Sequence, residues 1–145
     1  MKRIAIFCSL TLLLLAVSCH PSTDFPFHYK GKQIEFGQGG GFSGAVTQFV
    51  LLDDGRLFQR PWRDSSVVFV QQWKRNLTSQ LFLNYKSLNL QDLTYNEPGD
   101  LYYFIDYHPD EKSHHRIVWG KPGFQPEDNL ITYYNLLFRS SKPKS

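Results

Sequence analysis

Histidines and carboxylates gather around one short polar segment near residue 110. They are the residues of this chain that come nearest to a set of metal ligands. His108 precedes Asp110 and Glu111, and His114 and His115 follow them. Paired across a turn, His108, Asp110 and His114 could approach one cation, because imidazole nitrogens and carboxylate oxygens are common metal ligands. The chain has no H-E-x-x-H motif and no dense ligand cluster, so the sequence favours solvated loop histidines over a metal site. We expect no metal and no other cofactor.

Candidate nucleophiles are scarce in this chain. The G-x-S-x-G pattern of a nucleophile elbow does not occur, and Ser43 lacks the flanking glycines that such an elbow needs. Asp53 and Asp54 stand beside Gly55, where hydrogen bonding within a turn explains them. The sequence therefore predicts no catalytic residue and a protein that is not an enzyme.

Glycines are concentrated in residues 37–44, and Gly39, Gly41 and Gly44 satisfy the spacing G-x-G-x-x-G. In a dinucleotide site those glycines open a helix whose N-terminus faces pyrophosphate, whereas residues 45–50 are strand-like. One remaining interpretation is a wide turn or bulge in which glycine relieves backbone strain. The other is a recognition loop with Phe42 as an exposed apolar anchor. The candidate binding residues are Gly39, Gly40, Gly41, Phe42, Ser43 and Gly44.

The N-terminal residues have the layout of a secretory signal. Lys2 and Arg3 precede an uncharged run at residues 4–17, and small Ser18 stands before Cys19. At about 1.5 Å per residue this run would span only ~21 Å as a helix, which is short of the ~30 Å hydrocarbon core of a bilayer. The pattern predicts a signal peptide at residues 1–18 that is removed, and not a permanent transmembrane helix.

Residues 15–19, Leu-Ala-Val-Ser-Cys, resemble the lipobox of bacterial lipoproteins. The resemblance implies that the Cys19 thiol is joined to diacylglycerol and that Cys19 becomes the new N-terminus. Cys8 would leave with the signal, so no thiol would remain for a disulfide. We expect a lipid-anchored protein of the bacterial cell envelope, in the outer membrane and facing the periplasm. An ordinary secretory signal followed by a chance cysteine is the alternative.

Charge and length limit the function of the mature chain. Removal of 18 of the 145 residues leaves 127 and lowers the net charge from +3 to +1, with 14 basic and 13 acidic residues. This balance argues against a nucleic-acid partner, which would require a clustered basic face. We expect a lipidated cysteine and tether at residues 19–31, one domain at residues 32–139 and a solvated basic tail at residues 140–145.

Most of the elements that would position these residues are predicted to be strands. Alternating or β-branched and aromatic runs predict strands at residues 32–36, 45–52, 56–59, 101–107 and 115–119. Gly55 suits the turn of a hairpin between the second and third of them. Residues 67–70 fit either a strand or the beginning of a helix.

Two segments have helical periodicity. The first should begin with Asn76 or Thr78 as its cap and bury one face, formed by Leu77, Leu81, Phe82, Tyr85 and Leu88. The last segment has its apolar side at Leu130, Tyr133, Tyr134, Leu137 and Phe138. Helices that follow hairpins predict an α+β fold with two helices packed on an antiparallel sheet.

The order of elements and the segment Gly-Gly-Phe-Ser-Gly at residues 40–44 are similar to the emfourin family. Emfourins are small proteins that inhibit thermolysin-like metalloproteases, and they carry a G-G-F-small-G segment in the same early position. The similarity covers residues 32–138 as an ordered pattern. It implies a protease as the partner of the glycine segment. The chain departs from the family in its lipid anchor, its higher aromatic content and its longer middle segment.

The sequence therefore predicts a membrane-anchored envelope lipoprotein with a non-catalytic domain that binds a protein partner through residues 39–44. A metalloprotease is the candidate partner. A second hypothesis is a ligand-binding or enzymatic lipoprotein with a pocket formed near His108, His114 and Tyr103. A third is a structural envelope component without a discrete site.

Overall fold

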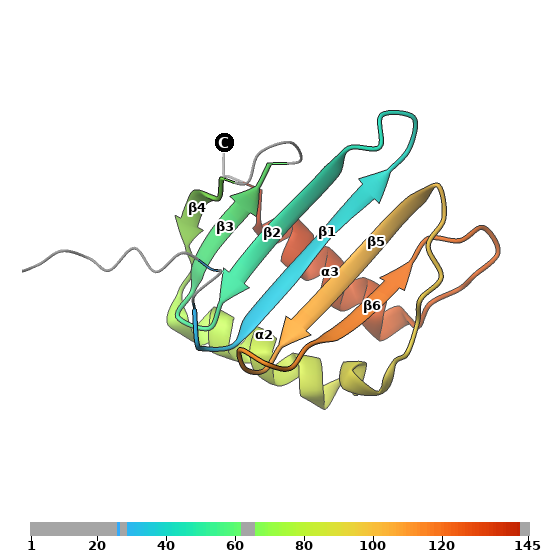
Figure 1. Ribbon diagram of the computed structural model, residues 1–145. Coiled ribbons are helices and arrows are strands. Elements are labelled where there is room, and N and C mark those ends of the chain that lie inside the picture. Colours follow the sequence, from blue (N-terminus) through green and yellow to red (C-terminus); the bar gives the residue numbers. More distant parts are fainter. Residues whose placement is uncertain (1–25, 27–28, 62–65, 143–145) are drawn as a thin grey trace, which may run out of the picture.

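A six-stranded antiparallel sheet with two helices on one face makes up the domain (Figure 1). The computed structural model describes Pro26, residues 29–61 and residues 66–142. The strand order is β4-β3-β2-β1-β5-β6. In chain order the elements are β1 (Gln33–Gly40), β2 (Val46–Leu52), β3 (Arg56–Arg60), β4 (Val68–Gln72), α2 (Arg75–Ser87), the 3₁₀ helix η3 (Leu90–Asp92), β5 (Leu101–His108), β6 (His115–Trp119) and α3 (Asp128–Ser140). The predicted α+β fold is confirmed, and of the ambiguous residues 67–70 the last three belong to strand β4.

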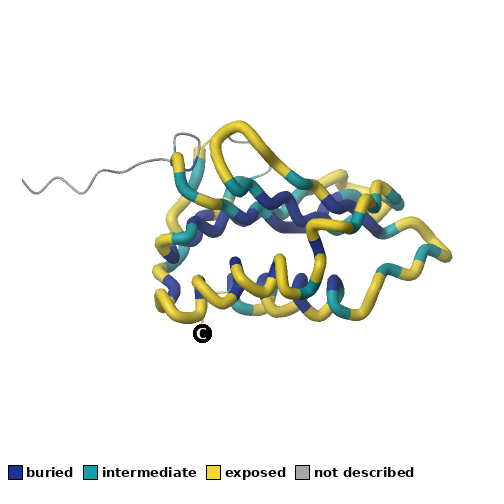
Figure 2. The backbone as a smooth tube through the Cα atoms, turned by 90° about the horizontal axis from the view of Figure 1, so that it is seen from below, coloured by how far each residue is buried: buried dark blue, intermediate teal, exposed yellow. Residues whose placement is uncertain are grey.

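The core lies between the sheet and the two helices (Figure 2). Alternate residues of each central strand, such as Ile34 and Phe36 of β1, point to the helices and are fully buried. Side chains of both helices pack against them: Leu81, Phe82 and Tyr85 from α2, and Leu130, Tyr133, Tyr134 and Leu137 from α3. The predicted apolar face of the last helix is therefore confirmed.

Buried tyrosines satisfy their hydroxyl groups within the core. The Tyr133 hydroxyl donates to the Leu81 carbonyl oxygen at 2.9 Å, and the Tyr134 hydroxyl donates to the Gly37 carbonyl oxygen at 3.1 Å. The Tyr85 hydroxyl lies 2.6 Å from His115 Nδ1. A buried hydroxyl without a partner would be costly, so these bonds allow tyrosine to serve as a core residue.

β1 extends farther than the alternation of its first residues predicts. Gly37 and Gly39 pair with both β2 and β5, and Gly40 pairs with β5, so the predicted end of this strand at residue 36 is wrong. A Cβ atom at Gly37 would lie 2.0 Å from the Thr47 carbonyl oxygen. The missing side chain therefore lets the two backbones approach closely, and the connection to β2 shortens to residues 41–45.

α2 begins two to four residues earlier than expected and has a different cap. Its N-cap is Lys74, which makes no side-chain cap hydrogen bond, so Asn76 and Thr78 are not caps. Thr78 is buried inside the helix, and its hydroxyl donates to the Lys74 carbonyl oxygen at 3.1 Å. Leu77, predicted to be on the buried face, is 39% exposed because it lies at the edge of that face.

One edge of the sheet is covered by a segment that the sequence did not reveal. The Glu97 amide donates to the Val118 carbonyl oxygen, and the Val118 amide donates to the Tyr95 carbonyl oxygen. These bonds run along the outer side of β6. They satisfy backbone groups that would otherwise be open for pairing with another chain.

The two ends of the sheet carry different turns, and the glycine-rich segment lies at only one of them. At the proximal end, where the chain enters the domain, Tyr29 lies beside the β2–β3 turn, and its hydroxyl donates to Asp53. The β5–β6 turn lies at the same end, because Gln33 pairs with both Leu52 and His108. The distal end carries the β1–β2 turn. No helix within the described residues is long and apolar enough to cross a membrane.

Candidate functional site

The glycine turn, residues 41–44, is held in one conformation by backbone hydrogen bonds. Below it the Gly40 amide donates to the Ala45 carbonyl oxygen at 3.2 Å, and the Gly41 amide donates to the Asp100 carbonyl oxygen at 2.7 Å. The Gly44 amide closes the turn on the Gly41 carbonyl oxygen at 3.1 Å. Gly40, Gly41 and Gly44 have φ values of 99°, 71° and 61°, a region that side-chain-bearing residues rarely adopt. The glycines are thus required by the path of the turn.

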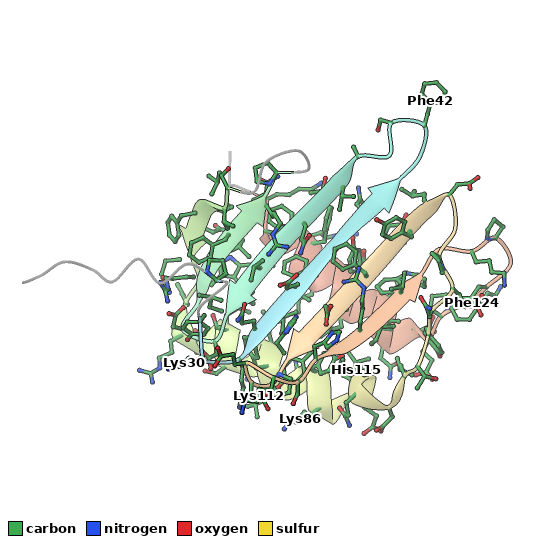
Figure 3. All side chains as sticks on the ribbon, in the orientation of Figure 1. Lys30, Phe42, Lys86, Lys112, His115 and Phe124 are labelled. Atoms are coloured by element: carbon green, nitrogen blue, oxygen red, sulfur yellow. The ribbon has the colours of Figure 1, made fainter. Side chains whose placement is uncertain are left out.

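Phe42 occupies the outer corner of this turn and points away from the domain (Figure 3). Its side chain is fully exposed. Ser43 Oγ beside it accepts a hydrogen bond from the Ala45 amide at 3.3 Å. Phe42 is therefore not a core residue, and the interpretation of the segment as a purely structural turn does not account for its aromatic side chain.

The predicted binding residues do not all lie in the turn. Gly41, Phe42, Ser43 and Gly44 are exposed. Gly39 and Gly40 belong to β1, and the buried Gly39 lies against the ring of Tyr102, whose hydroxyl would be 2.6 Å from a Cβ atom there. The surface available for contact is consequently the turn itself.

Leu101 adds exposed apolar surface beside the glycine turn, and the sequence did not predict this. It pairs with Gly40 at the beginning of β5 and is 46% exposed. The same strand end supplies the Asp100 carbonyl oxygen that holds Gly41. The only signal in the sequence is its position directly after Pro98, Gly99 and Asp100, because a strand that starts after such a break has its first residue at the sheet margin.

Dinucleotide binding is not supported by the geometry of the glycines. Gly44 is followed by Ala45 and then by strand β2. A pyrophosphate site of the G-x-G-x-x-G type requires the N-terminus of a helix at that point. The expectation from sequence, that these glycines serve a strand and not a nucleotide, agrees with the observed elements.

A second group of polar residues lies on the sheet face opposite the helices and centres on Asp106. This carboxylate is 6% exposed. Its Oδ1 is 3.0 Å from His114 Nδ1 and 3.5 Å from His108 Nε2, and its Oδ2 accepts from Arg116 at 3.1 Å. Glu35 approaches His108 Nε2 at 3.9 Å. The group thus brings together one guanidinium, two imidazoles and two carboxylates from β1, β5, β6 and the β5–β6 turn.

The residues that the sequence suggested for a cation do not form a site. Asp110 instead accepts the backbone amides of Lys112 and Ser113 at 2.8 Å each, and these bonds hold the pKa of the Asp110 carboxyl below its usual value. His108 and His114 converge on Asp106 in its place. Within the described part of the chain, no three histidine, cysteine, aspartate or glutamate side chains are arranged to hold a metal ion.

Tyr103 is separated from the two histidines, so the predicted pocket of His108, His114 and Tyr103 is not formed. Tyr103 lies on the helix side of β5 and stacks on Trp119 with ring centroids 5.9 Å apart. His108 lies on the other face, where it helps to line a hollow of about 190 Å³. That hollow is lined by Pro26, Tyr29, Gln33, Glu35, His108, Asp110 and Glu111.

Cys19 and most of the predicted tether lie outside the described residues. Pro26 and Tyr29, which fall within the predicted tether, are described. Pro26 is buried, and Tyr29 packs against a small apolar cluster of Val50, Leu52 and Phe58. Burial and the hydrogen bond to Asp53 raise the pKa of the Tyr29 hydroxyl. The chain is therefore fixed to the domain from Tyr29 onward.

The chain matches no protein-family model, and no curated protein matches it. The residues and geometry described above are accordingly the basis for a proposal about function.

Proposed function

We propose that this chain is a lipid-anchored protein of the bacterial envelope whose domain binds another protein through the glycine turn and catalyses no reaction. In this proposal Cys19 carries the lipid, and Phe42 enters an apolar pocket of the partner. The partner suggested by the resemblance to emfourins is a thermolysin-like metalloprotease, which the domain would inhibit. Lipid attachment places the domain at a membrane, in our proposal the outer membrane on its periplasmic side.

The observation that carries the proposal is the full exposure of Phe42 on a rigid turn. The apolar surface of Phe42 is in contact with water, and a partner could bury it. Large aromatic side chains are enriched among the residues that dominate binding energy. Because three backbone hydrogen bonds already fix the turn, little conformational entropy would be lost on binding. Preorganisation of this kind improves affinity without adding contacts.

The position of the turn also suits a contact with a partner. β1 runs from the proximal end to the distal end over eight residues, which is about 26 Å at 3.3 Å per residue. The chain enters at the proximal end, so an anchored domain would hold Phe42 on the side away from its attachment.

The Asp106 group is the observation that favours a second candidate, a ligand-binding or enzymatic lipoprotein. Buried Asp106 lies beside His108 and His114, and His108 lines a polar hollow that could receive a small polar ligand. The Asp106 carboxylate already accepts from Arg116 and lies beside both histidines, which explains the group as an internal network. We therefore place this candidate second.

The decisive experiment compares the intact chain with Phe42→Ala and with Leu136→Ala, which truncates an exposed leucine on α3. The readout is inhibition of a thermolysin-like protease, with the thermal midpoint measured in parallel. Phe42→Ala should weaken inhibition by about thirtyfold, equivalent to ~2 kcal/mol, and leave the midpoint unchanged. Leu136→Ala should change neither. Inhibition by the Phe42 variant equal to that of the parent would exclude the glycine turn as the contact, and absence of inhibition by the parent would exclude this partner.

A further inference from the structure

α2 lies across the proximal end of the sheet (Figure 1). At its beginning, the Trp73 amide donates to the Gly55 carbonyl oxygen of the β2–β3 turn at 2.8 Å. Toward its other end, Tyr85 stacks on Tyr107 with ring centroids 4.5 Å apart and reaches His115 at the start of β6. The helix therefore spans the end of the sheet at which the chain enters the domain.

The exposed surface of α2 has positive charge and apolar side chains but no negative charge. No aspartate or glutamate occurs from residue 74 to residue 88. Lys74, Arg75 and Lys86 are all exposed. Leu83 is 65% exposed and lies at the centre of the face opposite the buried Tyr85 side. Basic residues around an exposed leucine are typical of a helix that lies at a membrane interface.

Further lysines extend this basic surface along the proximal end. Lys30, Lys86 and Lys112 lie along one margin of the molecule, away from Phe42 (Figure 3). All three, and Lys32 beside Lys30, are exposed.

Three acidic residues of the proximal end bond to neighbouring groups, whereas Glu111 is exposed beside Lys112. Asp54 forms an ion pair with Arg56 at 2.8 Å. Asp53 accepts from the Lys32 amide and the Tyr29 hydroxyl, and Asp110 accepts two backbone amides. The exposed basic residues of α2 and the proximal end, at positions 30, 32, 74, 75, 86 and 112, therefore outnumber the exposed acidic residues there, Asp54, Asp110 and Glu111.

We propose that α2 and the lysines at 30, 32 and 112 rest on the anionic headgroups of the membrane that holds Cys19. The inference rests on the proposed lipid anchor. Six residues separate Cys19 from Pro26, and even fully extended the seven steps between them reach only about 25 Å. Since the described chain begins at the proximal end, the anchor keeps this end near the bilayer. Because the α2 surface is positively charged, anionic lipid is the membrane component whose charge complements it.

This contact orients the domain. Attraction to anionic lipid brings the lysines to the headgroups, and Leu83 enters the boundary of the apolar region. The glycine turn, at the far end of β1, then lies at the opposite end of the domain from the proximal lysines. Each basic residue near such a surface contributes about fivefold to the ratio of bound to unbound orientations at moderate salt.

The test uses the full chain, purified with its lipid and reconstituted into vesicles of phosphatidylcholine with or without phosphatidylglycerol. Leu83→Cys carries an environment-sensitive dye, and Leu101→Cys at the distal end is the matched control. A lipid-borne quencher should quench the dye at residue 83 in the anionic vesicles only, and should not quench the dye at residue 101. High salt should reverse the quenching. The triple variant K74Q/R75Q/K86Q should lower the quenched-to-unquenched ratio by about tenfold or more.

Failure of the anchor and failure of the contact give different results. The chain without an introduced cysteine should take no dye, because Cys19 would be acylated and Cys8 removed. Labelling of that chain, or its failure to float with vesicles, refutes the anchor. Flotation without quenching at residue 83 refutes the α2 contact alone, as does equal quenching in neutral vesicles. A dye signal at residue 83 that rises with protein concentration in detergent would identify a second copy of the chain as the occupant and overturn the inference.

Discussion

Buried tyrosines should make the domain sensitive to alkaline pH. Tyr85, Tyr133 and Tyr134 are 0%, 2% and 4% exposed, and burial raises the pKa of all three hydroxyls above the usual value of 10.0. In the unfolded chain they would ionise near pH 10. The stability that these neutral hydroxyls contribute is therefore complete below pH 10 and is lost as the pH rises from there toward the folded-state values, since the unfolded chain loses protons first.

The size of this effect follows from the number of tyrosines. A group that ionises only in the unfolded state lowers the free energy of unfolding by about 0.4 kcal/mol at pH 10 and about 1.4 kcal/mol at pH 11. Three such groups give a loss of about 1.2 and then about 4 kcal/mol. Since domains of this size have a total stability of about 5–15 kcal/mol, the midpoint of urea unfolding should fall steeply over this single pH unit.

The assay is urea unfolding followed by far-ultraviolet circular dichroism at pH 7, 10 and 11. Tyr133→Phe removes one ionisable group and the bond to the Leu81 carbonyl oxygen. It should cost about 1–3 kcal/mol at pH 7 but reduce the alkaline loss by about 1.4 kcal/mol at pH 11. Phe82→Leu, in the same core, should lower stability without changing the alkaline loss. An alkaline loss that is the same in Tyr133→Phe as in the parent would refute the reasoning.

Further predictions concern the core, the sheet and the anchor. Leu81→Ala and Ile117→Ala should each lower the free energy of unfolding by about 2–5 kcal/mol, since both side chains are at most 1% exposed; changes below about 0.5 kcal/mol at both would contradict their burial. Gly37→Ala should cost about 1–3 kcal/mol through overpacking against Thr47, and an unchanged urea midpoint would mean that β1 and β2 can separate there without cost. Cys19→Ala should give a product without acyl label that leaves the detergent phase, because no second thiol takes the lipid; retained label would exclude lipidation at Cys19.

The sequence was sufficient to predict the fold class because its apolar residues alternate with the period of each element. Ile117 and Trp119 on β6, and Tyr133 and Leu137 on α3, are buried as their spacing predicts. The error at Leu77 arises from the same rule, since a residue at the margin of a helical face satisfies the spacing but not the burial. The cap was missed because Lys74 is not a usual capping residue and makes no side-chain cap hydrogen bond.

Strand parity could have corrected the predicted pocket. Residues that are an odd number apart in a strand lie on opposite faces, which separates Tyr103 from His108 five positions later. The same rule places Asp106 on the face of His108. Asp106 was missed because a single carboxylate within a predicted strand carries no periodic signal of its own.

Glycine in a strand was the feature hardest to predict. Gly37 and Gly39 lack the side chains whose pattern defines a strand, and their local preference favours a loop. Their pairing is decided by distant residues: the Thr47 backbone and the ring of Tyr102 occupy the space that a Cβ atom would need. Only the neighbouring strands, which are far apart in sequence, contain that information.

The two proposed surfaces lie at opposite ends of β1, and this separation allows them to be tested independently. The K74Q/R75Q/K86Q variant changes α2 and leaves the glycine turn intact, so binding of a soluble partner should be the same as for the parent. Binding to a partner that must reach the turn from above the bilayer should weaken only when the chain is in vesicles, because lost orientation lowers the fraction of domains that present Phe42. On vesicles, the apparent dissociation constant of the variant would then equal its intrinsic value divided by that fraction. An equal loss of affinity in solution and on vesicles would show that α2 touches the partner itself, and would place both surfaces in one interface.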